Sequence, residues 1–346
     1  MSSKRYCMVA AILFGVSMGN AFAQQTAGQK DAPGKINLDV VVTASKGGPV
    51  GGLSEKDFTV LDNKKTRSIA SFAAVEGKEA AVQVVIVIDS VNTPYTYLAY
   101  QRDQILKYMR SNGGKLPYVT SFAVLTDTSF EMYEEGAGKD GNALADKLQH
   151  TEIGLRIDNR SQGFWGAADR MTLSLNALRS LTVVEAKKPG RKLVLWVSPG
   201  WPLLSGPEVE LEGNEADEVY HNAIVFSREM RKAGVTLYSI NSWGATENLS
   251  REDYYEAFLN GLKGPGDAEW GNLALQVLAA QSGGLVLSSN DAVQMLQQCV
   301  ADANQYYQIT LDPAPDEKPN QYHQIQVKVG QGGLVARTRM GYYAQP

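Results

Sequence analysis

One short segment gathers side chains that are suited to binding chemistry. Asp89, Ser90, Asn92 and Thr93 directly follow a run of apolar, mostly β-branched residues at 82–88. Such a run is typical of a strand that is buried on both faces of a parallel sheet. Ligands of open α/β sheets lie beyond the carboxyl ends of the strands, so this loop is the first candidate site. The alternative is that Asp89 and Thr93 only cap the helix that follows.

The same sequence gives little support to catalysis. Hydrolysis by a Ser-His-Asp set needs a histidine beside the serine, and the three histidines, His150, His221 and His323, are scattered. Beyond residue 23 no serine stands in Gly-x-Ser-x-Gly, and the chain lacks His-Glu-x-x-His. We therefore predict that the protein is not an enzyme. An exported hydrolase with an unrecognised site and a periplasmic small-ligand receptor stay as alternatives.

Buried apolar runs recur along the middle of the chain, with helical patterns between them. These runs lie at residues 82–88, 122–125, 193–197 and 235–240. Strands that alternate with helices predict an α/β fold, a doubly wound and mostly parallel sheet flanked by helices, over residues 81–304. Thr93 followed by Pro94 predicts a helix with Thr93 as its N-cap. Residues 242–270 show no period and are predicted to form a loop-rich insertion.

Both ends of the chain carry short stretches that alternate between apolar and polar residues. Alternation with period two predicts half-buried strands. We expect residues 35–80 and 305–346 to form one small β-sandwich-like domain. We also expect the strands around Val40 and Val327 to share a sheet, and the last two strands to form a hairpin around residues 330–333.

The loop after the first buried strand resembles that of a von Willebrand factor A domain. The resemblance implies a divalent cation held by an Asp-x-Ser-x-Ser motif, a threonine that opens a later helix, and a later aspartate. Asp89 and Thr93 match the ends of the first motif, and Thr172 matches the later threonine. Val91 and Ser198 stand where the family has a serine and an aspartate, so the cation motif is degenerate.

A longer series of segments is similar to one branch of that family, the VWFA-related proteins of the acidobacterial type. The segments are VGGLSEKDF at 50–58, DSVNTP at 89–94, GRKLVLWVS at 190–198, SGG at 282–284 and RTRMGYYA at 337–344. Their order and spacing run through nearly all of the chain beyond the export signal. The resemblance implies a von Willebrand A-like, Rossmann-like domain.

The substitutions in the motif limit what it could hold. Mg²⁺ prefers six oxygen ligands in an octahedral arrangement, whereas Val91 offers no oxygen and Ser198 only a neutral hydroxyl. The resemblance therefore implies either no cofactor or a weakly bound Mg²⁺, Mn²⁺ or Ca²⁺. Its ligands would be Asp89, Thr93 and Thr172.

The first residues predict export. Residues 1–23 combine a basic start, an apolar run and a final Ala-Phe-Ala, as in a secretory signal peptide. The polar residues 24–34 are predicted to be a flexible tether. We expect export by the Sec pathway, to the periplasm or out of the cell.

The composition excludes several classes of protein. Among 346 residues, 44% are hydrophobic and 20% charged, as in ordinary globular chains. The net charge of −4, without a basic stripe, argues against nucleic acid as a partner. No second apolar run reaches the ~18 residues of a spanning helix, so we expect no transmembrane anchor in the mature chain. Cys299 is left without a partner for an internal disulfide once Cys7 is removed with the signal.

Taken together, these patterns predict an exported, non-catalytic protein-binding module for adhesion or assembly. Its partner would be a protein or another envelope macromolecule. The predicted contacts at the strand-end face are Asp89, Ser90, Asn92, Thr93, Thr172, Ser198 and Trp201. Further tryptophans near glycine or proline, at positions 165, 243 and 270, could enlarge this surface.

Overall fold

The structure is a computed structural model that describes most of the chain. The described residues are 34–44, 47–76, 81–153, 163–202, 211, 213–243, 254–315 and 317–345. The predicted signal peptide and all but the last residue of the predicted tether lie outside these ranges, so both stay predictions. No helix within the described ranges is long and apolar enough to cross a membrane.

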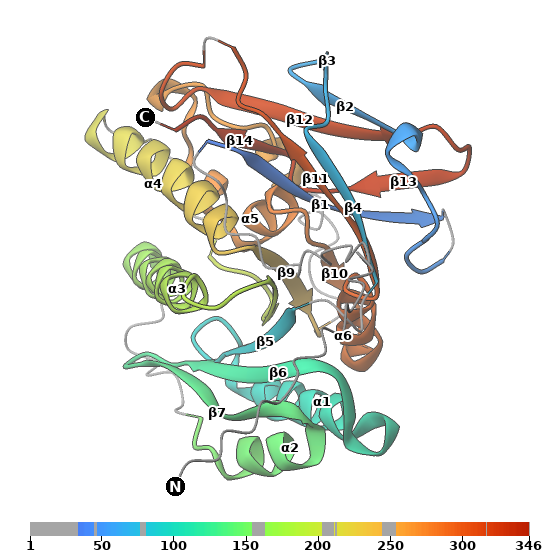
Figure 1. Cartoon of the computed structure of the whole chain (residues 1–346). Helices are drawn as coiled ribbons and strands as arrows, with labels where there is room; N and C mark the ends of the chain where they lie inside the picture. Colours follow the sequence, from blue (N-terminus) through green and yellow to red (C-terminus); the bar gives the residue numbers. More distant parts are fainter. Residues whose placement is uncertain are drawn as a thin grey trace, which may run out of the picture.

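A six-stranded sheet forms the centre of the molecule, with the order β10-β9-β8-β5-β6-β7 (Figure 1). Its strands are β5 (Val82–Asp89), β6 (Lys115–Leu125), β7 (Phe130–Asp140), β8 (Arg191–Val197), β9 (Val235–Asn241) and β10 (Val286–Ser288). Only β7 at one edge is antiparallel to its neighbour; the other pairs of this sheet are parallel. Counted from β5, the chain fills the sheet outward in both directions, as in a doubly wound fold. The predicted α/β fold is confirmed.

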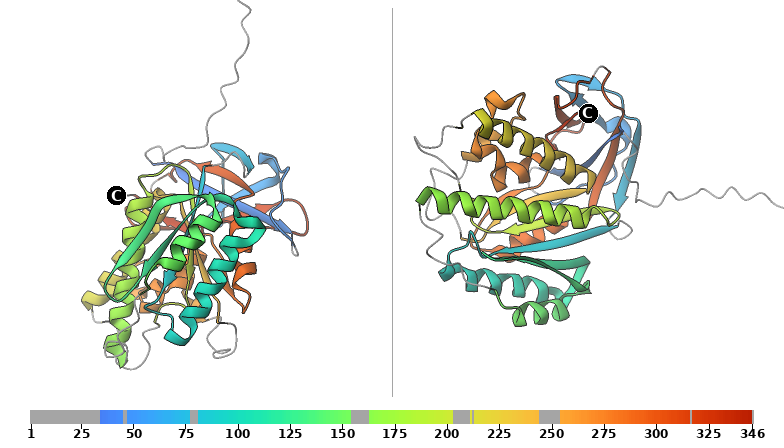
Figure 2. Two further views of the ribbon diagram at one scale, coloured as in Figure 1. Left: turned by 90° about the horizontal axis from the view of Figure 1, so that it is seen from below. Right: turned by 90° about the vertical axis from the view of Figure 1, so that its left-hand side faces the viewer.

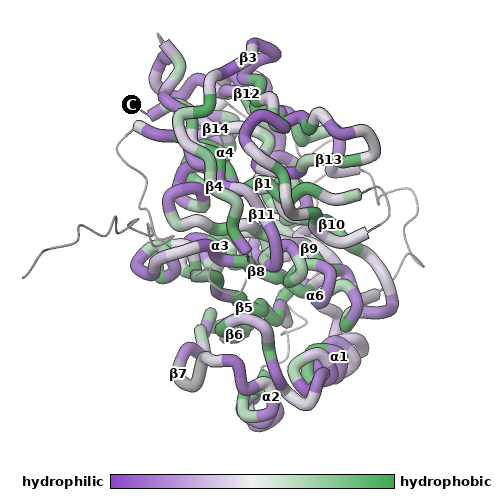
Figure 3. Tube along the Cα trace, turned by 45° about the vertical axis from the view of Figure 1, so that its right-hand side comes forward, coloured by the Kyte–Doolittle hydropathy of each residue, from purple (hydrophilic) through white to green (hydrophobic). Residues whose placement is uncertain are grey.

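Helices cover both faces of this sheet (Figure 2). One face carries α1 (Tyr95–Gly114), α2 (Gly141–His150) and α6 (Ala292–Ala301), and the other carries α3 (Gly163–Glu185), α4 (Gly213–Lys232) and α5 (Leu275–Gln281). Ile86 packs into the first layer and its neighbour Val87 into the second, because successive side chains of a strand point to opposite faces. Both are fully buried, which stabilises the fold by about 2 kcal/mol each. This double burial explains the continuous apolar run, visible along β5 in Figure 3.

The two ends of the chain form two further four-stranded sheets. One has the order β13-β1-β11-β4, and the other β14-β12-β2-β3. The strands are β1 (Ile36–Ala44), β2 (Phe58–Asp62), β3 (Lys65–Arg67), β4 (Ser71–Glu76), β11 (Gln305–Leu311), β12 (Tyr322–Val329), β13 (Leu334–Arg337) and β14 (Gly341–Tyr343). All their pairings are antiparallel. Apolar residues from both sheets share one cluster, which includes Leu38, Ile309 and Val327.

Two predictions about these end strands are wrong. Val40 lies on β1 and Val327 on β12, so they belong to different sheets whose apolar side chains share one cluster. The predicted hairpin is also absent, because β13 pairs with β1 and β12 pairs with β2 and β14. Residues 330–333 therefore carry the chain from one sheet to the other. Alternation reports which side chains face inward, and it does not report which strand lies alongside.

Buried polar contacts join the end strands to the central sheet. Asp302, which follows α6, forms an ion pair of 2.5 Å with Arg337 of β13 and accepts a hydrogen bond of 2.7 Å from the hydroxyl of Tyr238 on β9. Arg191 of β8 donates to the backbone oxygen of Asp302 at 3.0 Å.

The division into domains stays a prediction. Within the predicted insertion, residues 244–253 lie outside the described part. Its other residues include two short 3-10 helices, η3 (Tyr254–Phe258) and η4 (Pro265–Asp267), and η5 (Trp270–Leu273) begins at its last residue.

Candidate functional site

Asp89 is the last residue of β5, at the carboxyl edge of the central sheet, and it is 0% exposed. Its Oδ2 accepts hydrogen bonds of 2.8 Å from the indole Nε1 of Trp196 and of 2.8 Å from the amide Nδ2 of Asn92. Its Oδ1 accepts a bond of 2.9 Å from the backbone nitrogen of Asn92. All three donors are neutral. The carboxylate is therefore satisfied by the protein itself.

Burial of Asp89 opposes its charged form, and its hydrogen bonds support that form. Burial raises the pKa of this carboxyl above its usual range, and the hydrogen bonds from Asn92 and Trp196 offset only part of that rise. A buried charge without an opposite charge beside it is costly, whereas a protonated carboxyl is much less so.

The hydroxyl groups of the loop also turn inward. Ser90 donates to the backbone oxygen of Leu125 at 2.8 Å. Thr93 donates to the side-chain oxygen of Gln101 at 3.0 Å, and both residues are buried. The predicted N-cap role of Thr93 is wrong, because α1 begins at Tyr95 with Pro94 in the cap position. Neither hydroxyl presents a free oxygen at the surface of the loop.

The helix α3 reaches this loop through Ser174. The amide Nδ2 of Asn92 donates to the Ser174 hydroxyl oxygen at 2.8 Å, and that hydroxyl donates to the backbone oxygen of Arg170 at 2.8 Å. The resemblance implied that Thr172 opens a helix. Thr172 instead lies within α3, which begins at Gly163. Its side chain is exposed. Its role in binding a partner or a cation stays a prediction.

Val91 and Trp201 are buried in the apolar layer beneath the loop. The Trp201 ring stands edge-on to Trp196, with the ring centres 5.2 Å apart. Its indole nitrogen has no hydrogen-bond partner among the described residues. Ser198, also buried, accepts a bond of 3.2 Å from the backbone nitrogen of Gly200. The side chains of Val91, Trp201 and Ser198 therefore pack beneath the loop. Direct contact of Ser198 and Trp201 with a partner stays a prediction.

The atoms around Asp89 do not fit a divalent cation. A cation needs lone pairs pointing inward, whereas Asn92 and Trp196 direct N–H groups at the carboxylate. Val91 supplies only carbon on its side chain. Among the residues that the structure describes, no three or more His, Cys, Asp or Glu side chains form a group that could hold a metal ion.

Aromatic side chains, all of them exposed except the half-buried Trp243, stand around the same edge of the sheet. Tyr95, Tyr97 and Tyr100 lie on the first turns of α1, just after the Asp89 loop. Trp243, which follows β9, contacts Tyr97 with ring centres 4.1 Å apart, and Tyr100 donates to the backbone oxygen of Asn290 at 2.6 Å. A further aromatic side chain, 79% exposed, lies near the start of α3: Trp165. We call Tyr95, Tyr97, Tyr100, Trp165 and Trp243 the aromatic rim.

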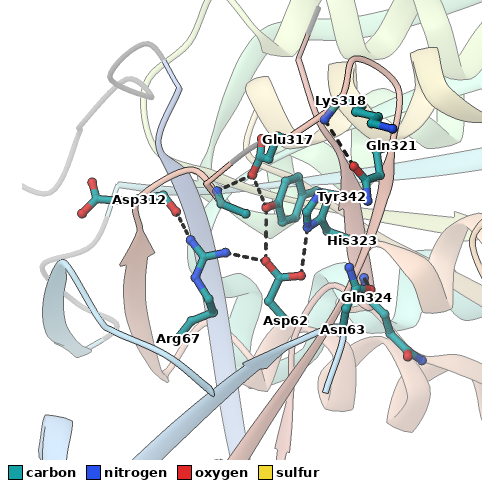
Figure 4. A network of polar contacts seen from close by, with 11 residues as sticks. Asp62, Asn63, Arg67, Asp312, Glu317, Lys318, Gln321, His323, Gln324 and Tyr342 are labelled. Atoms are coloured by element: carbon teal, nitrogen blue, oxygen red, sulfur yellow. Dashed lines mark hydrogen bonds and ion pairs between the residues drawn. The ribbon is translucent and has the colours of Figure 1, made fainter. Parts of the chain in front are cut away.

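The three histidines lie on separate elements. His150 ends α2 and contacts the backbone oxygen of Asp146, while His221 is exposed on α4. His323 of β12 is buried, and its Nδ1 lies 2.9 Å from a carboxylate oxygen of Asp62 (Figure 4). In none of these contacts does a serine face a histidine, so the described residues offer no Ser-His pair of the kind that hydrolysis needs.

Three residues that hold the site were not predicted from the sequence. Trp196 lies in a predicted buried strand, and a buried indole needs a hydrogen-bond acceptor, which points to a nearby polar group. Ser174 lies three positions after Met171 and so shares the buried face of α3, which the sequence pattern identifies only by its apolar residues. Gln101 carries no signal, because polar helix residues are usually exposed.

Comparison with known proteins gives only distant likenesses. No protein-family model matches the chain, and no curated protein matches it. Among solved structures, the chain is similar to proximal thread matrix protein 1 from the mussel byssus. That match has 12% identity and a TM-score of 0.38, over 70% of this chain and 51% of the mussel chain, so this chain spans about half of it.

Two further solved structures show likenesses of the same order. The manganese-loaded TRAP protein of Plasmodium vivax matches with 10% identity and a TM-score of 0.34, over 78% of this chain and 96% of that one. The pilus adhesin SpaC of Lactobacillus rhamnosus GG matches with 8% identity and a TM-score of 0.35, over 87% of this chain and 49% of that one. At these scores none of the likenesses carries an argument about a site or a function.

Proposed function

We propose that this chain is an exported, non-catalytic module that binds another protein through its aromatic rim. The observation that carries the proposal is the contrast at one edge of the sheet. The polar groups of the Asp89 loop are used within the protein, while Tyr95 beside them is 68% exposed. Tyrosine and tryptophan give large contact areas at a low cost in conformational entropy, and they dominate the energy of many interfaces.

The spacing of the rim favours a macromolecular partner. Its side chains come from α1, from α3 and from the end of β9, so they are spread along the edge of the sheet. Trp165 precedes Ser174 by about 13 Å along the axis of α3, at 1.5 Å per residue. A surface of this extent suits a protein better than a small ligand, which binding sites enclose in one cavity.

The predicted site residues take two roles in this proposal. Asp89, Thr93 and Trp201 hold the loop in shape beneath the rim, since their side chains are buried. Thr172, exposed on α3, is a candidate direct contact. A divalent cation has no part in the proposed binding, because the groups around Asp89 direct N–H donors at its carboxylate.

Export and membership in the acidobacterial branch are part of the same proposal. Residues 1–23 support export by the Sec pathway, to the periplasm or out of the cell. The segments at 190–198 and 337–344 support the kinship with the VWFA-related proteins of that type. A separate hydrophobic cluster within the end strands supports a β-sandwich-like domain of residues 35–80 and 305–346 beside a von Willebrand A-like domain of residues 81–304.

A capture experiment tests this function. The mature chain would be immobilised, exposed to envelope proteins of the source organism, and crosslinked with and without EDTA. A rim variant would carry Tyr95→Ser, Tyr97→Ser and Trp165→Ser; a control would carry Val183→Ser and Val335→Ser, which replace exposed apolar residues outside the rim. We expect a discrete partner whose captured amount falls about tenfold or more for the rim variant only.

Two results would count against the proposal. Capture that is undiminished in the rim variant would show that the partner uses another surface. Capture that EDTA abolishes in the wild-type protein would show that a cation takes part in the binding.

A further inference from the structure

The strand β4 is the last strand of its sheet, and within the described residues only one of its two edges is paired. Its backbone pairs with β11, in a register that runs without a shift from Ser71 to Glu76. In such a strand, alternate backbone N–H and C=O groups point away from the partner. These groups form a regular row about 20 Å long. Most side chains of β4 are exposed, namely those of Ser71, Ala73, Ala74 and Glu76.

The other edge strands that the structure describes are protected against pairing, whereas β4 is not. An edge strand is protected when it is very short or carries charged side chains. Two of the others, β10 and β14, have three residues each, and β3 is Lys65-Thr66-Arg67. The edge strand β7 carries glutamates, and β13 ends at Arg337. In β4 the single charged residue is Glu76, at its end, and the strand contains no proline.

The residues of β4 are complementary to themselves in an antiparallel pair. Neighbouring side chains point to opposite faces, so a twofold axis perpendicular to the sheet must place one residue opposite its own copy. An axis at Ala73 places Phe72 opposite Ala74. It also places Ser71 opposite Val75. Each larger side chain then lies opposite a smaller one.

The same register keeps the charges of the two copies apart. Glu76 falls opposite the neutral Ala70, and the two copies of Glu76 lie at opposite ends of the pair. Like charges directly opposite each other destabilise a sheet, and this register has none. An axis at Ala74 would instead place Glu76 against the ring of Phe72. Ala73 is therefore the favoured centre.

We propose that two copies of this chain pair through β4, antiparallel and centred on Ala73, which joins their β13-β1-β11-β4 sheets into one continuous sheet. Closed twofold pairs are the commonest arrangement of homo-oligomers. Two short strands bury a small interface, so we expect a dimer with a Kd of about 10 μM. The inference is independent of the aromatic rim, so its failure would leave the proposed partner binding untouched.

Sedimentation velocity of charge variants tests the pairing. Ala73→Lys places a lysine opposite a lysine, and Ala73→Glu places a glutamate opposite a glutamate. The matched control is Val335→Lys, at an exposed position of β13 on the other edge of the same sheet. The mature chain and each variant would be compared from about 1 to 100 μM, a range that spans the expected Kd.

The wild-type protein and Val335→Lys are expected to dimerise with the same Kd. Each Ala73 charge variant alone should dimerise at least about fivefold more weakly, because like charges then face each other. An equimolar mixture of Ala73→Lys and Ala73→Glu should dimerise again, with a Kd within about twofold of the wild-type value, because opposite charges then meet.

Cysteine variants test the register without adding charge. In Ala73→Cys the two new thiols face each other, whereas in Ala74→Cys they are offset by two residues along the pair. Cys299 is buried and does not compete. Under mild oxidation, covalent dimers should form about tenfold faster in Ala73→Cys than in Ala74→Cys, since a disulfide needs closely spaced Cβ atoms.

Three results would overturn the pairing. A wild-type protein that stays monomeric at about 100 μM would leave the edge of β4 to a strand of another protein or to residues 24–33 of this chain. Equal weakening by Val335→Lys and Ala73→Lys would place the dimer interface elsewhere. A mixture of the two charge variants that stays monomeric, or equal crosslinking of the two cysteine variants, would contradict a pair centred on Ala73.

Discussion

Two buried aspartates of this protein are stabilised in opposite ways. Asp89, at the end of β5, meets only neutral donors, from Asn92 and Trp196. Asp62, at the end of β2, forms an ion pair of 2.6 Å with Arg67 and lies 2.9 Å from His323 (Figure 4). Both carboxyl groups are almost fully buried. The same residue type therefore sits in an uncharged environment in the central sheet and in a charged one among the end strands.

The difference follows from what each aspartate connects. Asp62 of β2 contacts Arg67 of β3, His323 of β12 and Tyr342 of β14. Two of these partners reach the segment between β11 and β12: Tyr342 donates to Glu317 at 2.6 Å, and Arg67 donates to the backbone oxygen of Asp312 at 2.6 Å. A charged network of this kind ties these strands to the segment between β11 and β12. Asp89 lies at the edge of a sheet that is already held by two apolar layers, so it needs only local donors.

The largest effect is expected from Asp62→Ala. This change leaves the guanidinium of Arg67 and the ring of His323 without their carboxylate, and breaking a buried ion pair costs about 3–5 kcal/mol. Urea unfolding would measure the loss. The control Asp146→Ala removes an exposed ion pair with Arg110 and should cost less than about 1 kcal/mol. Equal losses of stability in Asp62→Ala and Asp146→Ala would show that the buried ion pair contributes no more than the exposed one.

Asp89→Asn is expected to cost about 2–3 kcal/mol, although it keeps the shape of the side chain. Either orientation of the new amide turns its N–H groups toward a donor, from Trp196 or from the backbone of Asn92, and a buried unsatisfied donor is costly. Denaturant unfolding followed by tryptophan fluorescence would report the loss. An unchanged denaturant midpoint would mean that the hydrogen bonds from the neutral donors to Asp89 contribute nothing to stability.

Tyr342→Phe should have a smaller effect, about 1 kcal/mol. The hydroxyl is lost from Glu317, but that carboxylate keeps the backbone nitrogen of Ala314 at 2.5 Å, and Asp62 keeps its ion pair. Calorimetric melting would measure the change. A loss as large as that of Asp62→Ala would show that the hydroxyl, and not the ion pair, holds this network.

The smallest expected effect is on the pH dependence of the folding stability. Burial raises the pKa of Asp89 in the folded state, so the folded state holds this proton at pH values where the unfolded chain has released it. Its contribution to stability is complete below the ordinary pKa of about 3.9 and falls as the pH rises toward the folded-state value. The stability of the wild-type protein relative to Asp89→Asn should therefore fall as the pH rises above about 4. A relative gain over that range would contradict the assignment.

The sequence allowed the fold of the central sheet to be predicted more fully than that of the end strands. The run at 82–88 predicted a doubly buried strand, because a sequence that is apolar on both faces has no other place in a sheet. Val40 and Val327 were assigned to one sheet because alternation identifies their inward face. The choice of neighbouring strand depends on long-range packing, which a local pattern does not contain.

The candidate site was located from the sequence, but its chemistry was not. A strand followed by an aspartate predicted that Asp89 stands at the carboxyl edge of the sheet, and it does. One donor to Asp89 comes from Trp196, 107 residues away along the chain. The others come from Asn92, whose amide also donates to Ser174 on the distant helix α3. No spacing rule brings these groups together, and so the inward turn of the loop could not be foreseen.

The indole N–H of Trp196 reports most directly on whether the protein itself fills this site. In a ¹⁵N NMR spectrum, with the signal assigned by its loss in Trp196→Phe, we expect that proton to exchange slowly with solvent. We also expect its signal to keep its width when stoichiometric MnCl₂ is added, because no paramagnetic ion reaches Asp89. Fast exchange, or strong broadening of that signal by Mn²⁺, would contradict a strand-end loop that is closed by its own donors.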